Sequence, residues 1–193
     1  AWFGDWENDA KNASKVVDSN GEPMVVYHGS RQAGFTEFDE SSDMFFTDRF
    51  DVAATYGSYD DVELPSIDAE FYDEHEGVYS AFIVAKNPIN ADFHGKTWFQ
   101  SLDGMTADDV VSKAKRLNND GAIIDNIIDI GRHGFVSDKG DSTVYAVFNS
   151  NQIKSAIGNT GEFSQTNPDI RFSRKAKNPI TEGIKSAAND AKN

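Results

Sequence analysis

The stretch VVYHGSR, residues 25–31, joins a short apolar run to four residues that present hydrogen-bonding groups or bare backbone. A histidine at the end of a strand can donate to a ligand hydroxyl, and Gly29 lets a flat amide approach the backbone closely. The Ser30 hydroxyl adds a contact, and Arg31 can meet a phosphate. Taken alone, the tetrapeptide 28–31 is also typical of a turn that ends a strand. Other parts of the sequence are needed to distinguish a ligand site from such a turn.

The composition limits the class of protein. A chain of 193 residues is long enough for one domain with a core and short for two. It has no cysteine, which excludes disulfides, cysteine zinc sites and a thiol nucleophile. The net charge of -14 disfavours a general nucleic-acid binder. No apolar run is long enough for a membrane span, and no signal peptide is visible. The alternating carboxylates and turn glycine of a calcium-binding loop do not occur in the sequence.

Periodicity and capping predict many short strands and few helices. The predicted strands are 16–17 and 24–27, joined by an Asn20-Gly21 turn, then 44–47, a strand within 77–92 that Asn87-Pro88 ends, 122–130 and 142–150. The predicted helices are a short one in 1–12 bearing Trp2, Phe3 and Trp6, one from an Asp48 cap to Tyr56, one that Thr106 caps, and one in 151–158. This pattern favours an α+β fold with a mainly antiparallel sheet.

A second motif gives the first one a context. Residues 45–48, Phe-Phe-Thr-Asp, precede a short helix that carries Tyr56, eleven positions after Phe45. The order and spacing of the two motifs resemble those of the diphtheria-toxin-like and poly(ADP-ribose) polymerase-type ADP-ribosyltransferases. A wider likeness, in NASKVVDSNGEPMVVYHGS, VFNSNQIKSAIGNTGEF and NPDIRFS, is similar to the ADP-ribosyltransferase domains of large phage polyvalent proteins. It covers 1–173 as one domain, and 174–193 reads as a polar linker or tail.

The resemblance implies a fold and a set of site residues. The fold is an ADP-ribosyltransferase-like split antiparallel β-sandwich with flanking short helices, in which the strand at 25–28 lies beside that at 145–148. The co-substrate is NAD. The implied contacts are His28 to the adenosine-side ribose, Gly29 and Ser30 to the nicotinamide carboxamide, Arg31 to the pyrophosphate, Tyr56 stacked on the nicotinamide ring, and Phe45 and Phe46 beside it.

The implied activity is mono-ADP-ribosylation. ADP-ribose would pass from NAD to a host macromolecule, protein rather than nucleic acid, and nicotinamide would leave through an oxocarbenium-like state. The implied setting is the cytoplasm of a bacterial host, with the domain delivered by phage as part of a larger polypeptide. The missing start methionine agrees with an excised piece.

The sequence departs from the family in the strand at 142–148. The family usually has a catalytic glutamate at the start of this strand, and here Val144 stands at or beside that place. The candidates that could take over are Thr143, Asp141 and Gln152. Relatives without the glutamate transfer a single unit or are inactive, so polymer formation is not expected. Two alternatives stay open: a catalytically degenerate NAD-binding or interaction module, and a metal-free ribonuclease that uses His28 and His133.

Overall fold

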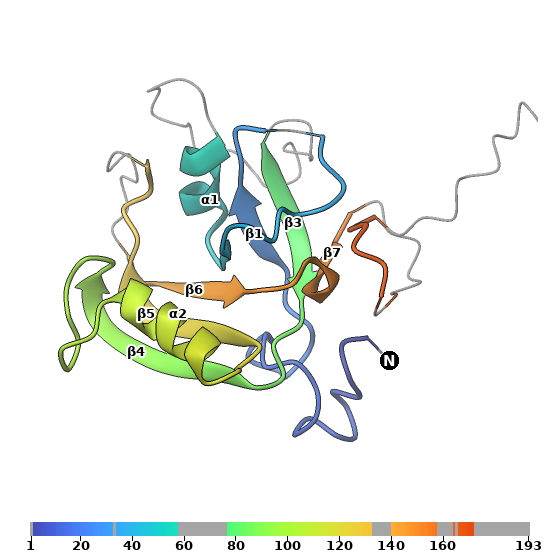
Figure 1. Cartoon of the computed structure of the whole chain (residues 1–193), viewed down its shortest axis with the longest axis horizontal. Helices are drawn as coiled ribbons and strands as arrows, with labels where there is room; N and C mark the ends of the chain where they lie inside the picture. The colour runs from blue at the N-terminus through green and yellow to red at the C-terminus, as the bar shows by residue number, and fades with distance from the viewer. Residues whose placement is uncertain are drawn as a thin grey trace, which may run out of the picture.

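The computed structural model describes residues 2–32, 34–57, 77–132, 140–157, 164 and 166–171. Seven strands form one sheet in the order β4-β5-β6-β2-β1-β3-β7 (Figure 1). Their bounds are β1 Val26–Gly29, β2 Met44–Thr47, β3 Val78–Ile83, β4 Pro88–Thr97, β5 Gly121–Ile128, β6 Ser142–Val147 and β7 Ile153–Ser155. All neighbours pair antiparallel except β4 and β5, which are parallel. The α+β class and the mainly antiparallel sheet are confirmed.

The sheet bends so that its two halves pack against each other. In Figure 1 the strands β1 and β3 run steeply across the direction of β4, β5 and β6. One core cluster joins Val26, Tyr79 and Ile83 of the first half to Phe46 and Tyr145 of the second. Because side chains alternate along a strand, the neighbouring residues of β2, β5 and β6 face the other way, into a second core. The arrangement is a sandwich made from one continuous sheet.

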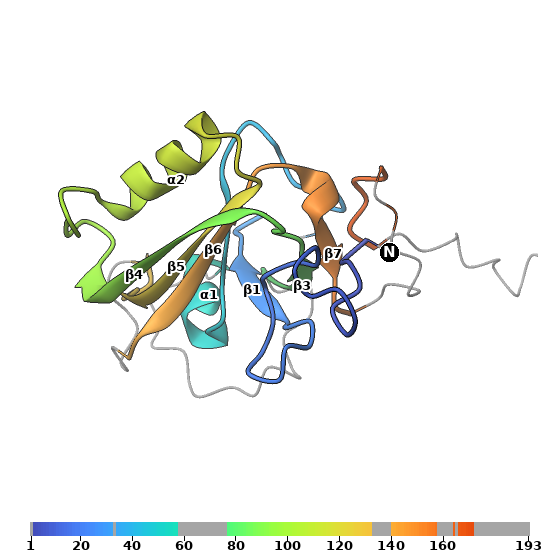
Figure 2. The same ribbon diagram turned by 90° about the horizontal axis from the view of Figure 1, so that it is seen from below.

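Two α-helices cover different parts of this sheet. Helix α2, Ala107–Arg116, buries Ala107, Val110, Val111 and Ala114, the spacing of one helical face, against β4 and β5 (Figure 2). Its start is closed by a capping box between Thr106 and Asp109, so the predicted cap is confirmed. Helix α1, Phe50–Gly57, packs on β1 through Ala53 and Ala54. No helix of the described residues is long and apolar enough to span a bilayer.

Strands β1 and β2 separate at one end, and this opening positions the site. Their register pairs Tyr27 with Thr47. On its other edge β1 stays paired with β3 through Gly29, which lies opposite Val78, and Ser30 N donates to Gly77 O over 2.7 Å. The sheet therefore continues on the β3 side of β1 and opens on the β2 side.

Several predicted elements differ in the structure. The predicted neighbour of β1 was the strand at 145–148, but β2 lies between them and pairs with β6. The predicted hairpin is present in a short form: Val17 bridges Pro23, and Asp18 N donates to Glu22 O over 2.8 Å. Before it, Ser14 and Lys15 bond to the 83–85 segment. Asp48 does not cap α1, since its side chain accepts from the Thr143 amide.

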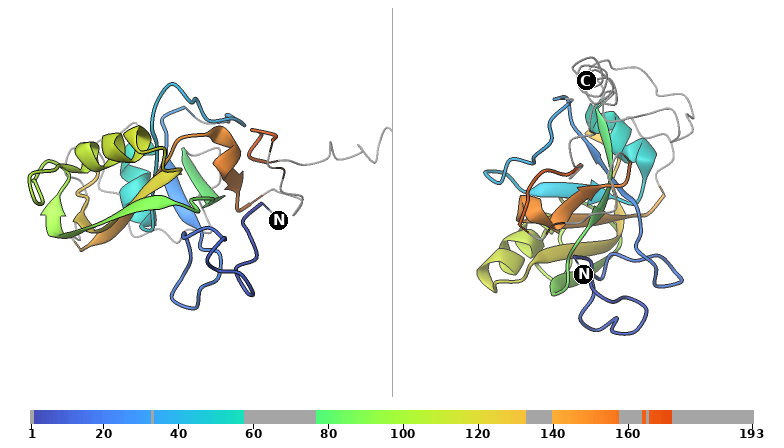
Figure 3. Two further views of the ribbon diagram at one scale, coloured as in Figure 1. Left: turned by 60° about the horizontal axis from the view of Figure 1, so that its bottom comes forward. Right: turned by 90° about the vertical axis from the view of Figure 1, so that its right-hand side faces the viewer.

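The predictions for the two ends of the domain also differ. Residues 2–12 form turns and bends rather than a helix, and the Trp2 indole donates to Asn151 O over 2.8 Å, which holds the start of this segment near β7 (Figure 3). The predicted helix at 151–158 is a 3₁₀ turn, Ser150–Gln152, followed by β7, which pairs with β3. The proposed tail at 174–193 and His133 lie outside the described residues, as do residues 58–76.

Candidate active site

A pocket of about 770 Å³ opens where β1 and β2 separate. This volume is within the range of about 300–1,000 Å³ typical of small-ligand sites. Its lining comes from β1 and β2, from α1, from the ends of β4 and β5 with the segments that follow them, and from single residues of α2 and β6. The lining residues are Tyr27, His28, Gly29, Phe45, Phe46, Thr47, Ala53, Tyr56, Thr97, Trp98, Phe99, Asp108, Ile128, Asp129, Ile130, Gly131 and Val144.

The His28 side chain crosses the opening between β1 and β2. Its Nδ1 lies 2.7 Å from the carbonyl oxygen of Phe45. A carbonyl only accepts hydrogen bonds, so Nδ1 carries the proton and Nε2 of the neutral ring is an acceptor. The ring lies among Phe38, Phe46 and Tyr79, and this burial lowers the pKa of His28 below its ordinary value, although the bond to Phe45 opposes the shift. The sequence predicts a hydrogen-bond donor at His28, whereas the neutral ring offers the pocket an acceptor at Nε2.

Gly29 is required by the close approach of α1. A Cβ at this position would lie 1.8 Å from the Ala53 carbonyl oxygen and 2.8 Å from the Tyr56 Cβ. The backbone of Gly29 also has a defined direction. Ser30 N points to β3, and successive peptide groups of a strand alternate, so the N–H and C=O of Gly29 turn toward the β2 side. There they face the opening, beyond the Tyr27 and Thr47 pair.

Tyr56 lies at the C-terminal end of α1 and reaches across to the segment after β5. Its hydroxyl donates to Asp129 Oδ1 over 3.0 Å. Burial, together with the carboxylate, raises the pKa of Tyr56 well above its ordinary value, so the phenol stays neutral. The side chain keeps 40% of its surface exposed, which leaves its ring accessible from the pocket.

An aromatic wall faces α1 from the other side. Phe45 of β2 contacts Trp98 edge to face, with ring centroids 5.3 Å apart. Phe99, the next residue along, is 85% exposed. Trp98 and Phe99 belong to the segment between β4 and α2. Together with Tyr56 they give the pocket flat surfaces suited to planar rings.

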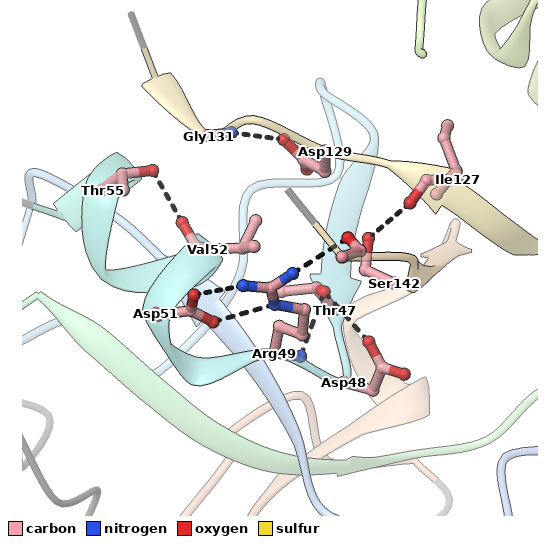
Figure 4. Close-up of polar contacts among 11 residues, drawn as sticks. Thr47, Asp48, Arg49, Asp51, Val52, Thr55, Ile127, Asp129, Gly131 and Ser142 are labelled. Atoms are coloured by element: carbon pink, nitrogen blue, oxygen red, sulfur yellow. Dashed lines mark hydrogen bonds and ion pairs between the residues drawn. The ribbon is translucent and has the colours of Figure 1, made fainter. Parts of the chain in front are cut away.

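A group of polar contacts fixes the start of α1 to β6. Asp48 N donates to Thr143 O over 3.2 Å, and Thr143 N donates back to Asp48 Oδ1 over 2.9 Å. Arg49 follows Asp48, and its Nε lies 3.0 Å from Asp51 (Figure 4). Its Nη1 donates to Gly140 O over 2.9 Å. These bonds hold the base of the pocket where β2 passes into α1.

The structure brings together only part of the predicted site. His28, Gly29, Phe45, Phe46 and Tyr56 all line the one pocket. The Ser30 hydroxyl instead closes a turn with Gln32, and Arg31 is exposed; neither lines the pocket.

The three candidates for the missing carboxylate also lie elsewhere. The Thr143 hydroxyl donates to Asp125 Oδ1 over 3.2 Å, on the face of β6 opposite Val144. Burial, only partly offset by this bond, raises the pKa of Asp125. Gln152 donates to Val84 O and Asp120 O and so ties three chain segments together. Asp141 lies near Gly95 and does not line the pocket.

Three lining residues, Trp98, Phe99 and Asp129, lie outside the motifs that the sequence indicated. The last of these directly follows the apolar run of β5, and an acidic residue at the end of a buried strand is a recognisable signal. The signal does not say which pocket the residue reaches. No group of three or more potential metal ligands occurs among the residues for which the structure gives positions.

Comparison with known proteins gives the family. The family described as ADP-ribosyltransferase in polyvalent proteins matches residues 18–163. The matched region contains every element from β1 to β7 and every residue that lines the pocket. No curated protein and no solved structure matches the chain. On the strength of the family match, the chain belongs to the ADP-ribosyltransferase domains of polyvalent proteins.

Proposed function

We propose that this domain transfers a single ADP-ribose unit from NAD to a protein and releases nicotinamide. The observation that carries the proposal is the meeting of His28, Gly29, Phe45 and Tyr56 in one pocket where β1 and β2 separate. Two sequence motifs that resemble NAD-binding motifs thus form a single site. Membership of an ADP-ribosyltransferase family supports the same activity.

The nicotinamide end of NAD fits the opening beside Gly29. A carboxamide has one acceptor and two donor hydrogens, and the N–H and C=O of Gly29 face the opening as a complementary pair. The Phe45 carbonyl, which lies across the opening, is occupied by His28 Nδ1. The His28 side chain therefore takes the place of a backbone bond to β2 at Phe45 and leaves the Gly29 backbone groups available to the ligand. The nicotinamide ring would lie against Tyr56, with Phe45 beside it.

The ribose is the expected partner of His28 Nε2. The neutral ring accepts there, and both ribose hydroxyls can donate. Holding the sugar at one end and the nicotinamide at the other orients the bond between them. This orientation lowers the barrier to dissociative cleavage relative to that for NAD in water. Val144 lies in the same lining and supplies an apolar surface where the family usually has a carboxylate.

The acceptor is proposed to be a protein. The net charge of -14 opposes approach to the phosphate backbone of a nucleic acid and favours a partner with a basic surface. The proposed setting is a phage polypeptide acting in the cytoplasm of a bacterial host, and it rests on the resemblance of the sequence to phage polyvalent proteins. Arg31 and Ser30 stay proposed NAD contacts that would require the 30–32 turn to approach the ligand.

One observation favours a second candidate, a domain that binds NAD without turnover. Strand β6 carries Val144 where the family's glutamate is expected, and Thr143 is engaged with Asp125. The two candidates differ in one measurable product. Incubation of the protein with NAD labelled in the adenine half and with bacterial lysate gives labelled protein and free nicotinamide for a transferase. Saturable NAD binding with neither product identifies the binding module instead.

A further inference from the structure

The pocket has a carboxylate that does not come from β6. Of the acidic residues in the described part of the chain, Asp108 and Asp129 line the pocket. Asp108 is exposed in the first turn of α2. Asp129 directly follows β5, the strand that pairs with β6, and its carboxylate contacts Tyr56. This contact with the tyrosine proposed to stack on nicotinamide makes Asp129 the stronger candidate.

The Asp129 side chain is held in one orientation. Its Oδ1 accepts from the Tyr56 hydroxyl over 3.0 Å and from Gly131 N over 2.8 Å, and Figure 4 shows the second of these bonds. The segment after Asp129 is also tied to α1, because Arg132 N donates to Thr55 Oγ1 over 2.9 Å. Both bonds to Asp129 use the same oxygen. They fix the carboxylate without occupying Oδ2 and so orient a charged group at the pocket.

The other acids have different surroundings. Asp125 points to the opposite face of the β5 and β6 pair, where it accepts from Thr143. Asp141 does not line the pocket, and neither does Asp48, whose Oδ1 accepts from the Thr143 amide. A carboxylate that acts on the ribose must be in the pocket and must be oriented. Asp129 meets both requirements.

We propose that Asp129 is the catalytic carboxylate of this domain, acting from the end of β5 in place of the glutamate that β6 lacks. The inference rests on the proposed function. In the reaction the C1′–N bond of NAD breaks, and its electron pair leaves with neutral nicotinamide. The positive charge that develops on the ribose is stabilised by the Asp129 carboxylate. The acceptor's lone pair then forms the new bond to C1′, and the acceptor's proton passes to Asp129 and on to solvent.

The decisive variant is Asp129→Asn. The amide oxygen of asparagine can still accept from Tyr56 and Gly131, so the anchoring bonds remain and only the charge is lost. We expect nicotinamide release to fall by about 100-fold or more, in the range typical of a lost acid–base or electrostatic group. The Kd for NAD should change less than about threefold, because the groups proposed to hold nicotinamide are intact.

Two further variants separate a catalytic role from a structural one. Asp103→Asn is the matched control, since Asp103 is exposed, does not line the pocket and has a left-handed backbone that asparagine accepts. Its nicotinamide release should equal that of the wild type. Tyr56→Phe removes the bond to Asp129 but keeps the ring. If Asp129 only anchored Tyr56, these two site variants would lose activity equally; we expect Asp129→Asn to lose far more.

The outcomes distinguish the inference from the proposed function. A wild-type protein that binds NAD but releases no nicotinamide overturns both. If the wild type is active and Asp129→Asn releases nicotinamide within about threefold of the wild-type rate, the inference is overturned and the transferase proposal stands. A loss in Asp129→Asn no greater than that in Tyr56→Phe also overturns it. Thermal unfolding and NAD titration of each variant show that the measured losses belong to folded, ligand-binding protein.

Discussion

His28 Nδ1 donates to the carbonyl oxygen of Phe45 over 2.7 Å, so a side chain replaces a backbone bond where β1 and β2 part. This bond fixes the tautomer of the histidine, spans the opening and leaves the edge of Gly29 unpaired by β2. The recognition groups of the pocket thus depend on one another, and several measurable consequences follow from this dependence.

Stability should depend on pH through His28. Burial lowers the pKa of this residue in the folded protein, while the unfolded chain keeps the ordinary value of 6.5. As pH falls below 6.5, the unfolded chain takes up a proton that the folded protein does not, so stability falls until the lower folded pKa is passed. Denaturant unfolding at pH 8 and pH 5 should show this slope, with a reduced slope in His28→Asn. Equal slopes in both proteins contradict the prediction.

Gly29→Ala should damage both fold and binding. The added Cβ would meet the Ala53 carbonyl at 1.8 Å, so α1 must move. We expect a loss of about 1–3 kcal/mol in the free energy of unfolding and weaker NAD binding, because Tyr56 moves with the helix. Gly21→Ala is the control: its backbone φ is +83° but nothing lies within 4 Å of the added atom, so it should lose some stability and bind NAD normally. Normal NAD binding by Gly29→Ala would show that α1 does not set the site.

Tyr56→Ala should weaken NAD binding more than Tyr56→Phe. Aromatic stacking contributes about 1 kcal/mol beyond buried area, so the alanine variant should raise the Kd about fivefold or more. The phenylalanine variant keeps the ring and should stay within about threefold of the wild type. Isothermal titration with NAD measures both. Equal losses in the two variants would mean that the hydroxyl, not the ring face, holds the ligand.

The product should carry single ADP-ribose units, with slow NAD hydrolysis as a side reaction. No described residue of β6 is a glutamate, and its neighbour Asp141 does not reach the pocket. Asp141→Asn should therefore reduce transfer much less than His28→Ala. Gel electrophoresis of labelled products checks the first point, and long ladders of ADP-ribose would refute it. An Asp141→Asn variant as inactive as His28→Ala would refute the second.

Gln152→Ala should act on stability and leave the site intact. The amide of Gln152 donates to Val84 O over 2.6 Å and to Asp120 O over 2.7 Å, far along the sheet from the pocket lining. Removing it leaves two partly buried carbonyls without this donor, at a cost of about 1–3 kcal/mol. Unfolding by denaturant should show the loss, and NAD titration should show no change. Weaker NAD binding at unchanged stability would instead support the candidate role that the sequence suggested for Gln152.

Elements with strong local signals could be predicted from the sequence. Helix α2 has its cap at Thr106 and apolar residues on one face, and β2 followed by α1 appears where the pattern indicated. The segment after Gln152 could not be predicted in this way. Its local pattern favoured a helix, but pairing of Ile153 with Ile83 makes it a strand, and that contact joins residues 70 positions apart.

The candidate site shows the same division between residues with a local signal and a residue placed by long-range packing. Four lining residues, His28, Gly29, Phe45 and Tyr56, could be identified because they lie within two short motifs whose order and spacing resemble a known family. Asp129 could not, since it reaches Tyr56 across 73 positions and only the packing of α1 beside the end of β5 brings the two together. The acid nearest to the expected place in sequence, Asp141, does not line the pocket.

The two bonds between Asp48 and Thr143 tie the chain just before α1 to β6. The last turn of the helix is held as well, because the Tyr56 hydroxyl donates to Asp129 and Thr55 accepts from the Arg132 amide. Helix α1 is thus anchored at both ends to segments far away in the sequence. The place of Tyr56 in the pocket therefore depends on two separate anchors, and a substitution at either one should change the width of the pocket.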